Sequence, residues 1–204
     1  MSKGCVYIVD DDFAMRDSLE MLLASQDYET RLFRDGNEFL QAAQFLPFGV
    51  LIVDLQMPGI DGLEMLDRLK ARKIRFPVVV ITGFGNITVA VKAMRAGAID
   101  FVEKPFSKEA ILTSMELALA SGNAPAEGDI KREVAQRLTR LSRREHEVMT
   151  RLVAGNSNKV AAINLGLSPR TVEIHRARVM EKMQAKSLSE LVRLAIAAGI
   201  NPEI

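Results

Sequence analysis

The sequence predicts an α/β domain followed by an all-α domain, and three observations support this fold class. Short apolar, β-branched runs alternate with helix-period segments as far as Ala120, which is typical of a parallel sheet covered by helices. A small, polar stretch punctuated by proline and glycine follows at 121–128 and predicts a linker. Beyond it the apolar residues recur with the helical period alone, which predicts a separate helical domain.

The N-terminal part is predicted to form five strand and helix units of a doubly wound sheet. Its strands are expected at 5–9, 29–33, 50–53, 78–81 and 101–102, the second being the weakest pattern. Helices are expected at 12–25, 36–44, 62–72, 88–96 and 107–120. Asp35, Ser107 and either Asn86 or Ile87 stand where these helices need N-caps.

The C-terminal part carries five helical patterns. They lie at 129–138, 142–154, 159–165, 169–183 and 188–198. Gly166 follows the third, while Ser168 is a good N-cap for the fourth and Pro169 suits its first turn. A short helix, a tight turn with glycine and a second amphipathic helix form a helix-turn-helix, whose second helix enters the major groove of DNA.

Charge and composition fit two domains with different partners. The chain has 204 residues, 48% of them hydrophobic, which is enough for two ordinary cores. The formal net charge is −4 before Glu127 and +5 from it onward. This favours cation or phosphate chemistry in the N-terminal part and nucleic-acid binding in the C-terminal part. The alternative is a charge bias of the solvated surface without a functional role. The single cysteine, Cys5, and the lack of any long apolar stretch predict a cytoplasmic protein without disulfides or a membrane span.

Five polar residues are expected to converge at one edge of the sheet. Asp10 and Asp11 end the first predicted strand, Asp54 the third and Thr82 the fourth, while Lys104 follows the fifth. Ligands of an open α/β sheet bind outside the carboxyl ends of its strands. Three close carboxylates repel one another and need a cation, and an all-oxygen set suits Mg²⁺. With the lysine, such a site can hold a phosphoryl group on a carboxylate.

The same residues resemble the receiver domains of bacterial two-component response regulators, which have a flavodoxin/CheY-like fold. The motifs are Val-Asp-Asp-Asp at 9–12, Val-Asp-Leu-Gln-Met-Pro-Gly at 53–59, Ile-Thr-Gly at 81–83 and Glu-Lys-Pro-Phe at 103–106. The resemblance implies that Asp54 is the phosphoacceptor and that Mg²⁺ is held by Asp10, Asp11, Asp54 and the backbone carbonyl of Gln56. Asp12 is expected to point away from this rim.

The resemblance also implies a conformational switch. Thr82 and Lys104 are expected to contact the phosphate, and Phe101 stands at the aromatic switch position. In this family the ring turns inward as the threonine hydroxyl moves to the phosphate, which repacks the face of the fourth and fifth helices. Phenylalanine has no hydroxyl to donate, so only the packing half of the switch is available. The peptide bond between Lys104 and Pro105 is a candidate for the cis form.

The C-terminal part resembles LuxR-type output domains of the NarL/FixJ class. The motifs are Leu-Ser-x-Arg-Glu-x-Glu-Val at 141–148, Ala-Gly-x-x-Asn-Lys at 154–159 and Ser-Pro-Arg-Thr-Val-Glu-Ile-His-Arg at 168–176. Candidate DNA-contacting residues are Lys159, Arg170, Thr171, Glu173, Ile174, His175, Arg176, Arg178 and Lys182. Glu173 and Arg176 are the first choices for reading bases, although a surface or phosphate contact is as good an explanation for any one arginine.

One position departs from the usual pattern of this class. Ala161 stands where a larger aliphatic residue is common. The short helix at 159–165 is therefore expected either to pack less tightly or to be rebuilt around Ile163.

Together these resemblances predict a phosphorylation-controlled transcription regulator. The expected domains are a receiver at 1–121, a linker and lead helix at 122–138 and a DNA-binding domain at 139–204. The expected partners are a sensor histidine kinase, promoter DNA, a second copy after phosphorylation and, as a further candidate, RNA polymerase. The protein is not expected to be an enzyme, apart from slow self-dephosphorylation.

Three alternative functions fit the sequence less well. A phosphotransferase or phosphatase would use Asp54 as a transient nucleophile, but no substrate motif accompanies it and the basic half stays unexplained. A LuxR-type sensor of a small ligand would have a ligand domain where the acid-rich half stands. A phosphate sink or adaptor would not need Thr171, His175, Arg176 and Lys182.

Overall fold

The computed structural model describes residues 3–83, 87–121 and 127–200, together with the side chains of most of them. The chain divides into two compact units, one of residues 1–84 and 96–122 and the other of residues 85–95 and 123–204. The domain limits expected from the sequence, at 121 and 138, stay predictions. No described helix is long and apolar enough to cross a membrane.

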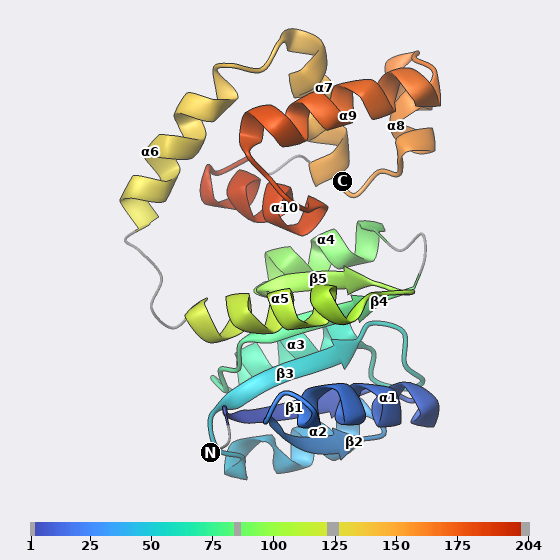
Figure 1. The fold of residues 1–204 in the computed structure, drawn as a ribbon, viewed down its shortest axis with the longest axis vertical. Coiled ribbons are helices and arrows are strands. Elements are labelled where there is room, and N and C mark those ends of the chain that lie inside the picture. The colour runs from blue at the N-terminus through green and yellow to red at the C-terminus, as the bar shows by residue number, and fades with distance from the viewer. Residues whose placement is uncertain (1–2, 84–86, 122–126, 201–204) are drawn as a thin grey trace. The chain divides into compact units, whose positions relative to one another are not determined.

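The first unit is built on a five-stranded parallel sheet, as the sequence predicted (Figure 1). Its strands are β1 (Cys5–Val9), β2 (Glu29–Phe33), β3 (Gly49–Asp54), β4 (Val78–Thr82) and β5 (Asp100–Glu103), in the spatial order β2-β1-β3-β4-β5. β3 and β4 run one residue further than expected, so Asp54 and Thr82 are the last residues of their strands. The sheet reverses its strand order beside β1 and β3, the place where such folds bind ligands.

The helices of this unit agree with the expected ones to within a few residues. They are α1 (Phe13–Ala24), α2 (Gly36–Ala42), α3 (Gly62–Ala71) and α5 (Lys108–Ala120), while α4 (Ile87–Ala96) is counted with the second unit. The single helix expected at 36–44 is instead α2 followed by a short 3-10 turn, η1 (Ala43–Phe45). Asp35 and Ser107 cap α2 and α5 as expected, and Asn86 lies outside the described residues.

One hydrophobic core joins the sheet to α1 and α5. Alternate residues of the strands, among them Val6, Ile8 and Ile52, pack with Leu19 of α1 and Met115 of α5, and all of these are buried. Alternation sends the neighbouring strand residues to the opposite face. There Tyr7 contacts the rings of Phe33, Phe39 and Phe76, at centroid distances of 5.4 to 6.4 Å. Both faces of the sheet are therefore covered, which explains its continuous apolar strands.

The second unit contains the C-terminal helices α6 (Glu127–Leu138), α7 (Arg143–Val153), α8 (Asn158–Leu165), α9 (Pro169–Met183) and α10 (Leu188–Ala197). α8 ends at Gly166 in the left-handed conformation, and Ser168 caps α9 with Pro169 in its first turn, as predicted. α6 begins at Glu127, inside the stretch that was expected to be linker. The helix thus starts two residues before the expected residue 129, and residues 122–126 of the expected linker lie outside the described residues.

Two details show how the helices of the second unit pack. Val134 of α6 is buried, and Arg137 donates to the backbone carbonyl of Met183 at the end of α9 over 2.9 Å, so the lead helix packs against the other helices of its unit. In α8, Ala161 is fully buried while Ile163 is 80% exposed. The helix is therefore packed around the alanine, and the idea that Ile163 replaces it in the core was wrong.

Candidate functional site

Three carboxylates meet at the carboxyl ends of β1 and β3. Asp54, the last residue of β3, and Asp10, which follows β1, are buried, while Asp11 is exposed. One carboxylate oxygen from each of the three lies within 4.8 Å of the others. The structure thus brings together the three acids that the sequence singled out. Such a set of oxygens is of the kind that a hard divalent cation prefers.

The side chain of Lys104 lies between two of these carboxylates. Its ammonium donates to Asp10 Oδ2 over 3.0 Å and to Asp54 Oδ2 over 2.9 Å. Burial lowers the pKa of Lys104, but the hydrogen bonds that its ammonium donates to Asp54 and Asp10 outweigh burial, so the pKa of Lys104 is raised overall. Burial raises the pKa of Asp10, against the hydrogen bonds that it accepts from the Asp12 amide and from Lys104. The lysine therefore keeps its charge while it holds two acids together.

Asp12 has a different task from its two neighbours. Its carboxylate accepts a hydrogen bond from the backbone amide of Ala14 over 2.8 Å and so caps the N-terminus of α1. Its own amide donates to Asp10 Oδ1 over 2.8 Å. The third acid of the run thus ends the loop and starts the helix, and its carboxylate is occupied by the cap.

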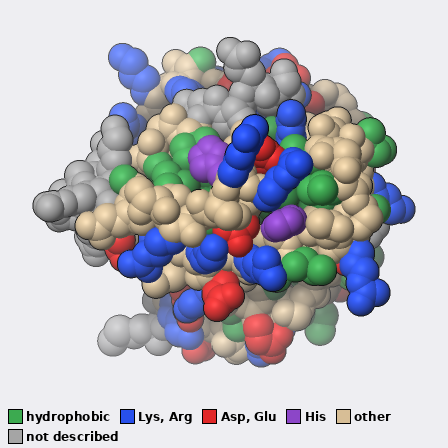
Figure 2. Space-filling view, turned by 90° about the horizontal axis from the view of Figure 1, so that it is seen from above, with side chains coloured by type: hydrophobic (Ala, Val, Ile, Leu, Met, Phe, Trp, Pro, Cys, Tyr) green, Lys and Arg blue, Asp and Glu red, His purple; other side chains and the backbone are tan. Residues whose placement is uncertain are grey.

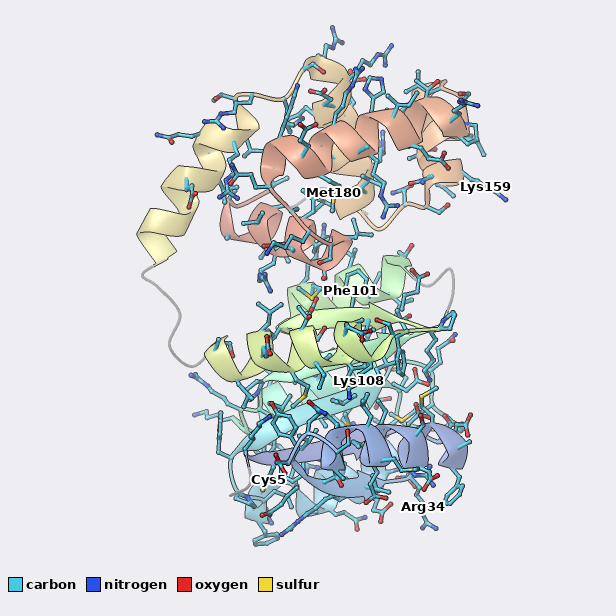
Figure 3. The ribbon with its side chains drawn as sticks, in the orientation of Figure 1. Cys5, Arg34, Phe101, Lys108, Lys159 and Met180 are labelled. Atoms are coloured by element: carbon cyan, nitrogen blue, oxygen red, sulfur yellow. The ribbon has the colours of Figure 1, made fainter. Side chains whose placement is uncertain are left out.

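Thr82 and Phe101 lie on adjacent strands beside the acids. Thr82 is buried at the end of β4, and its carbonyl accepts a hydrogen bond from the Lys104 amide over 2.8 Å. Phe101, labelled in Figure 3, is half-buried on β5 and is paired with Val80 of β4, two residues before Thr82. The peptide bond between Lys104 and Pro105 is cis, as predicted. Thr82 and Phe101 therefore lie on one pair of strands, and Lys104 directly follows the second of them.

The segment after Asp54 closes tightly against α3. A side chain at Gly62, the first residue of α3, would stand 2.6 Å from the carbonyl oxygen of Asp54. Only glycine allows the helix to start so close to the strand end. The amide of Gln56 donates to Asp54 Oδ1 over 3.3 Å, whereas the predicted role of the Gln56 carbonyl as a cation ligand stays a prediction.

The second candidate site is the exposed face of α9. Val172, Val179 and Met183 are buried and form its apolar face. Figure 2, which views the molecule from above, shows Lys and Arg side chains spread over the surface, with acidic groups and histidines between them. Of the predicted DNA contacts, five are exposed, namely Lys159, Arg170, Glu173, Ile174 and Arg178. Lys159 is labelled on α8 in Figure 3.

The other four predicted contacts are half-buried, and the side chains of three of them have partners within the unit. Arg176 donates to the side-chain oxygen of Asn158 on α8 over 3.2 Å. The ammonium of Lys182 lies 2.6 Å from a carboxylate oxygen of Glu145 on α7. The Thr171 hydroxyl lies 2.8 Å from the hydroxyl of Ser168, and His175 is the fourth residue of this group. All of these DNA contacts stay predictions, and for Lys182 the structure shows a second role.

The pair of Glu145 and Lys182 was not foreseen from the sequence. Glu145 is 3% exposed and forms a capping box with Ser142, in which each side chain bonds the backbone amide of the other residue. Hydrogen bonds from Lys182 and from the Ser142 amide lower the pKa of Glu145 to about 2. The Ser-x-x-Glu spacing could have predicted the box. Nothing local predicts the lysine, because it stands 37 residues further along the chain.

Comparison with known proteins assigns both halves of the chain. Residues 6–116 match the family of response regulator receiver domains, and residues 139–195 match the bacterial regulatory proteins of the luxR family. The transcriptional regulatory protein FixJ of Bradyrhizobium diazoefficiens is 47% identical over 200 residues, with 98% of each chain covered. FixJ of Rhizobium meliloti is 44% identical over 204 residues, covering 99% of this chain and 100% of that one.

A solved structure gives the same result. Full-length FixJ from B. japonicum superposes with a TM-score of 0.58 and 47% identity, covering 98% of this chain and 100% of that one. The fold class expected from the sequence is confirmed, and so is the resemblance to both domain types. The receiver match alone spans more than half of the chain, and the relatives align along nearly its whole length. The chain therefore belongs to the two-component response regulators that join a receiver to a LuxR-type DNA-binding domain and regulate transcription.

Proposed function

We propose that a sensor histidine kinase phosphorylates this regulator on Asp54. The observation that carries the proposal is the Lys104 ammonium, which donates to both Asp54 and Asp10 over about 3 Å. A phosphoryl group on Asp54 would bring further anionic oxygens to a place where a positive charge already stands. Asp54 is buried at a strand end and is held by the Gln56 amide, so its carboxylate is oriented before the reaction.

The acids fit a Mg²⁺ ion. Asp10, Asp11 and Asp54 offer oxygen ligands within 4.8 Å of one another, and the exposure of Asp11 leaves room for waters, which Mg²⁺ usually keeps. Together with the Gln56 carbonyl, these residues would hold the ion. When bound, the ion neutralises charge on the phosphoryl oxygens. Burial of Asp10 and Asp54 limits the access of water, which agrees with a phosphorylated aspartate that hydrolyses slowly by itself.

The phosphoryl group is proposed to act on Thr82 and Phe101. The Thr82 hydroxyl lies 3.5 Å from the Gly83 carbonyl, at the limit of a hydrogen bond, so little holds it in its present rotamer. Its movement toward the phosphate vacates space near β5, and the half-buried Phe101 ring fills it. This is proposed to repack the face of the fourth and fifth helices, through which two phosphorylated receivers would dimerise.

The dimer is proposed to bind promoter DNA through α9. Two linked helix-turn-helix units bind a two-fold site more tightly than one, because the second binding event becomes intramolecular. Glu173 is exposed for base contacts, and Arg176 would have to leave Asn158 to join it. Since the target is the chromosome, the proposal places the protein in the cytoplasm, with RNA polymerase as a further candidate partner.

The test is DNA binding to a promoter library at fixed salt. The wild type and Asp54→Asn are each compared with and without acetyl phosphate and Mg²⁺. We expect phosphorylation to increase specific binding of the wild type alone. If no sequence is enriched in either state while Asp54 is still phosphorylated, DNA recognition fails and the phosphate-sink or adaptor function takes its place.

A further inference from the structure

Arg16 of α1 reaches back to the loop that carries the acids. Its guanidinium Nη1 donates to the backbone carbonyl oxygen of Asp10 over 2.6 Å. The motifs described above do not include Arg16, and its side chain is half-buried beside the cluster of carboxylates. Hydrogen bonds from a charged donor to a carbonyl are short and strong. The contact therefore fixes a peptide group and is not an incidental surface interaction.

Asp10 is held at every polar group that it has. Its amide donates to the Phe33 carbonyl over 3.3 Å, and its carboxylate accepts from the Asp12 amide and from Lys104. Arg16 occupies its carbonyl, which is the remaining group. The first three contacts fix the strand end and the Asp10 carboxylate, but none of them acts on the peptide group between Asp10 and Asp11.

That peptide group determines where the Asp11 carboxylate lies. A peptide is planar, so holding its carbonyl oxygen also fixes the direction of the next residue's backbone amide. Asp11 is the exposed member of the three acids, and neighbouring side chains enclose it less than they enclose Asp10 and Asp54. Its orientation therefore depends on the backbone more than theirs does.

We propose that Arg16 is a positioning residue for the divalent-cation site, acting through the Asp10 carbonyl to orient Asp11. The inference rests on the proposed function, because it requires that the acids bind a cation. Groups that orient metal ligands commonly contribute 10- to 100-fold to metal affinity. Arg16 bonds to the backbone beside a ligand and does not bond to the ligand itself, so its effect is expected at the low end of that range.

Phe13 supports the geometry of Arg16. The guanidinium carbon lies 5.8 Å from the centroid of the Phe13 ring, which is 70% exposed at the start of α1. An aromatic face at this distance attracts the cation and restricts the rotamers of the arginine. The contact with the Arg16 guanidinium is thus a structural role for Phe13, a side chain that is mostly exposed.

The experiment measures Mn²⁺ binding to the full chain by electron paramagnetic resonance of the free ion, with Mn²⁺ as the probe for Mg²⁺. Arg16→Ala is expected to raise the Kd about tenfold. Arg16→Lys keeps a positive donor and is expected to recover part of the affinity. Arg72→Ala is the matched control, because Arg72 also donates its Nη1 to a carbonyl, that of Leu40 over 2.7 Å, and this bond lies outside the acid cluster.

The outcomes separate the inference from the proposed function on which it rests. If the wild type binds no Mn²⁺, or if Asp11→Asn and Asp54→Asn bind it as well as the wild type does, the cation site itself is refuted. If the wild type binds and Arg16→Ala binds equally well, the site stands and the role of Arg16 is refuted. Thermal unfolding of Arg16→Ala and Arg72→Ala shows whether both are folded, and an equal loss of affinity in both variants would also overturn the inference.

Discussion

Each unit of this protein contains a lysine bonded to a buried carboxylate, and the two sites differ in how completely their charges are matched. In the second unit Lys182 meets Glu145 alone, and the remaining needs of that carboxylate are met by the capping box. In the first unit Lys104 is shared by Asp10 and Asp54, and Asp11 stands close by. The pair of Glu145 and Lys182 has matched charges, whereas the acids around Lys104 carry more negative charge than that lysine can balance.

This difference indicates which of the two lysine–carboxylate sites is suited to take up a cation. A buried ion pair with matched charges and satisfied hydrogen bonds holds two helices in place. Removing one partner leaves the other as a buried charge without a counter-charge. A cluster with excess negative charge is held together against repulsion and can gain by taking up a cation. The same residue types thus form a charge-matched pair in one unit and a cluster able to bind a cation in the other.

The largest expected effect is that of Asp54→Asn on phosphorylation. We expect complete loss of phosphoryl uptake from acetyl phosphate, because an amide is not a nucleophile for this transfer, while the free energy of unfolding changes by no more than about 1 kcal/mol, since one repelling charge is removed. Electrophoresis on a phosphate-affinity gel measures the phosphorylation, and urea unfolding measures the free energy of unfolding. Marked destabilisation would mean that the acid cluster is as structural as the pair in the second unit.

Glu145→Gln is expected to do the opposite. It should leave phosphorylation unchanged and lower the free energy of unfolding of the second unit by about 2 kcal/mol, less than for a fully buried pair because Lys182 is partly exposed. Glu147→Gln is the matched control, since Glu147 makes exposed ion pairs with Arg143 and Arg144 on the same helix. Urea unfolding, monitored by circular dichroism, measures the stability of both variants. Equal destabilisation by Glu145→Gln and Glu147→Gln would show that the buried pair contributes no more than an exposed one.

The contribution of Glu145 is also expected to depend on pH. Because the pKa of Glu145 falls from its usual 4.5 to about 2 in the folded chain, the stabilisation is fully present above pH 4.5 and is lost as the pH falls toward 2. The stability difference between the wild type and Glu145→Gln should therefore shrink in acid. A difference that stayed constant from pH 6 to pH 3 would show that ionisation of Glu145 is not its source.

The smallest expected effect is stabilisation by Mg²⁺. At about five times its Kd, a ligand that binds only the folded state adds about 1 kcal/mol to the free energy of unfolding. We expect this gain in the wild type and in Glu145→Gln, and its loss in Asp11→Asn. Thermal unfolding in Mg²⁺, with the same ionic strength of NaCl as the control, measures it. A gain that survived in Asp11→Asn would place the cation elsewhere.

Much of the acid site could be predicted because strand ends are encoded locally. The apolar runs before Asp10, Asp54 and Thr82 place these residues at one edge of a parallel sheet. Helix ends were similarly visible, with Ser168 and Pro169 marking the start of α9.

Other features depend on the packing of distant segments and leave no local pattern. Lys182 finds Glu145 only after α7 and α9 have packed together. The bond from Arg16 to the Asp10 carbonyl involves a backbone atom that every residue has, so no residue type points to it. Rebuilding the short helix around Ile163 was one of two alternatives that the sequence left open, and the position of Ile163 on α8 instead turns it outward.

The bond between Arg137 and the Met183 carbonyl has a practical consequence for dissecting the protein. A fragment starting at residue 139 would begin where the match to the luxR family begins, yet it would remove both the buried Val134 and Arg137, which donates to the carbonyl at the end of α9. A fragment starting at Glu127 keeps both. A fragment that keeps these contacts of the DNA-binding domain is therefore longer than the segment that matches the family. The helix that precedes this domain in the sequence also packs as part of it.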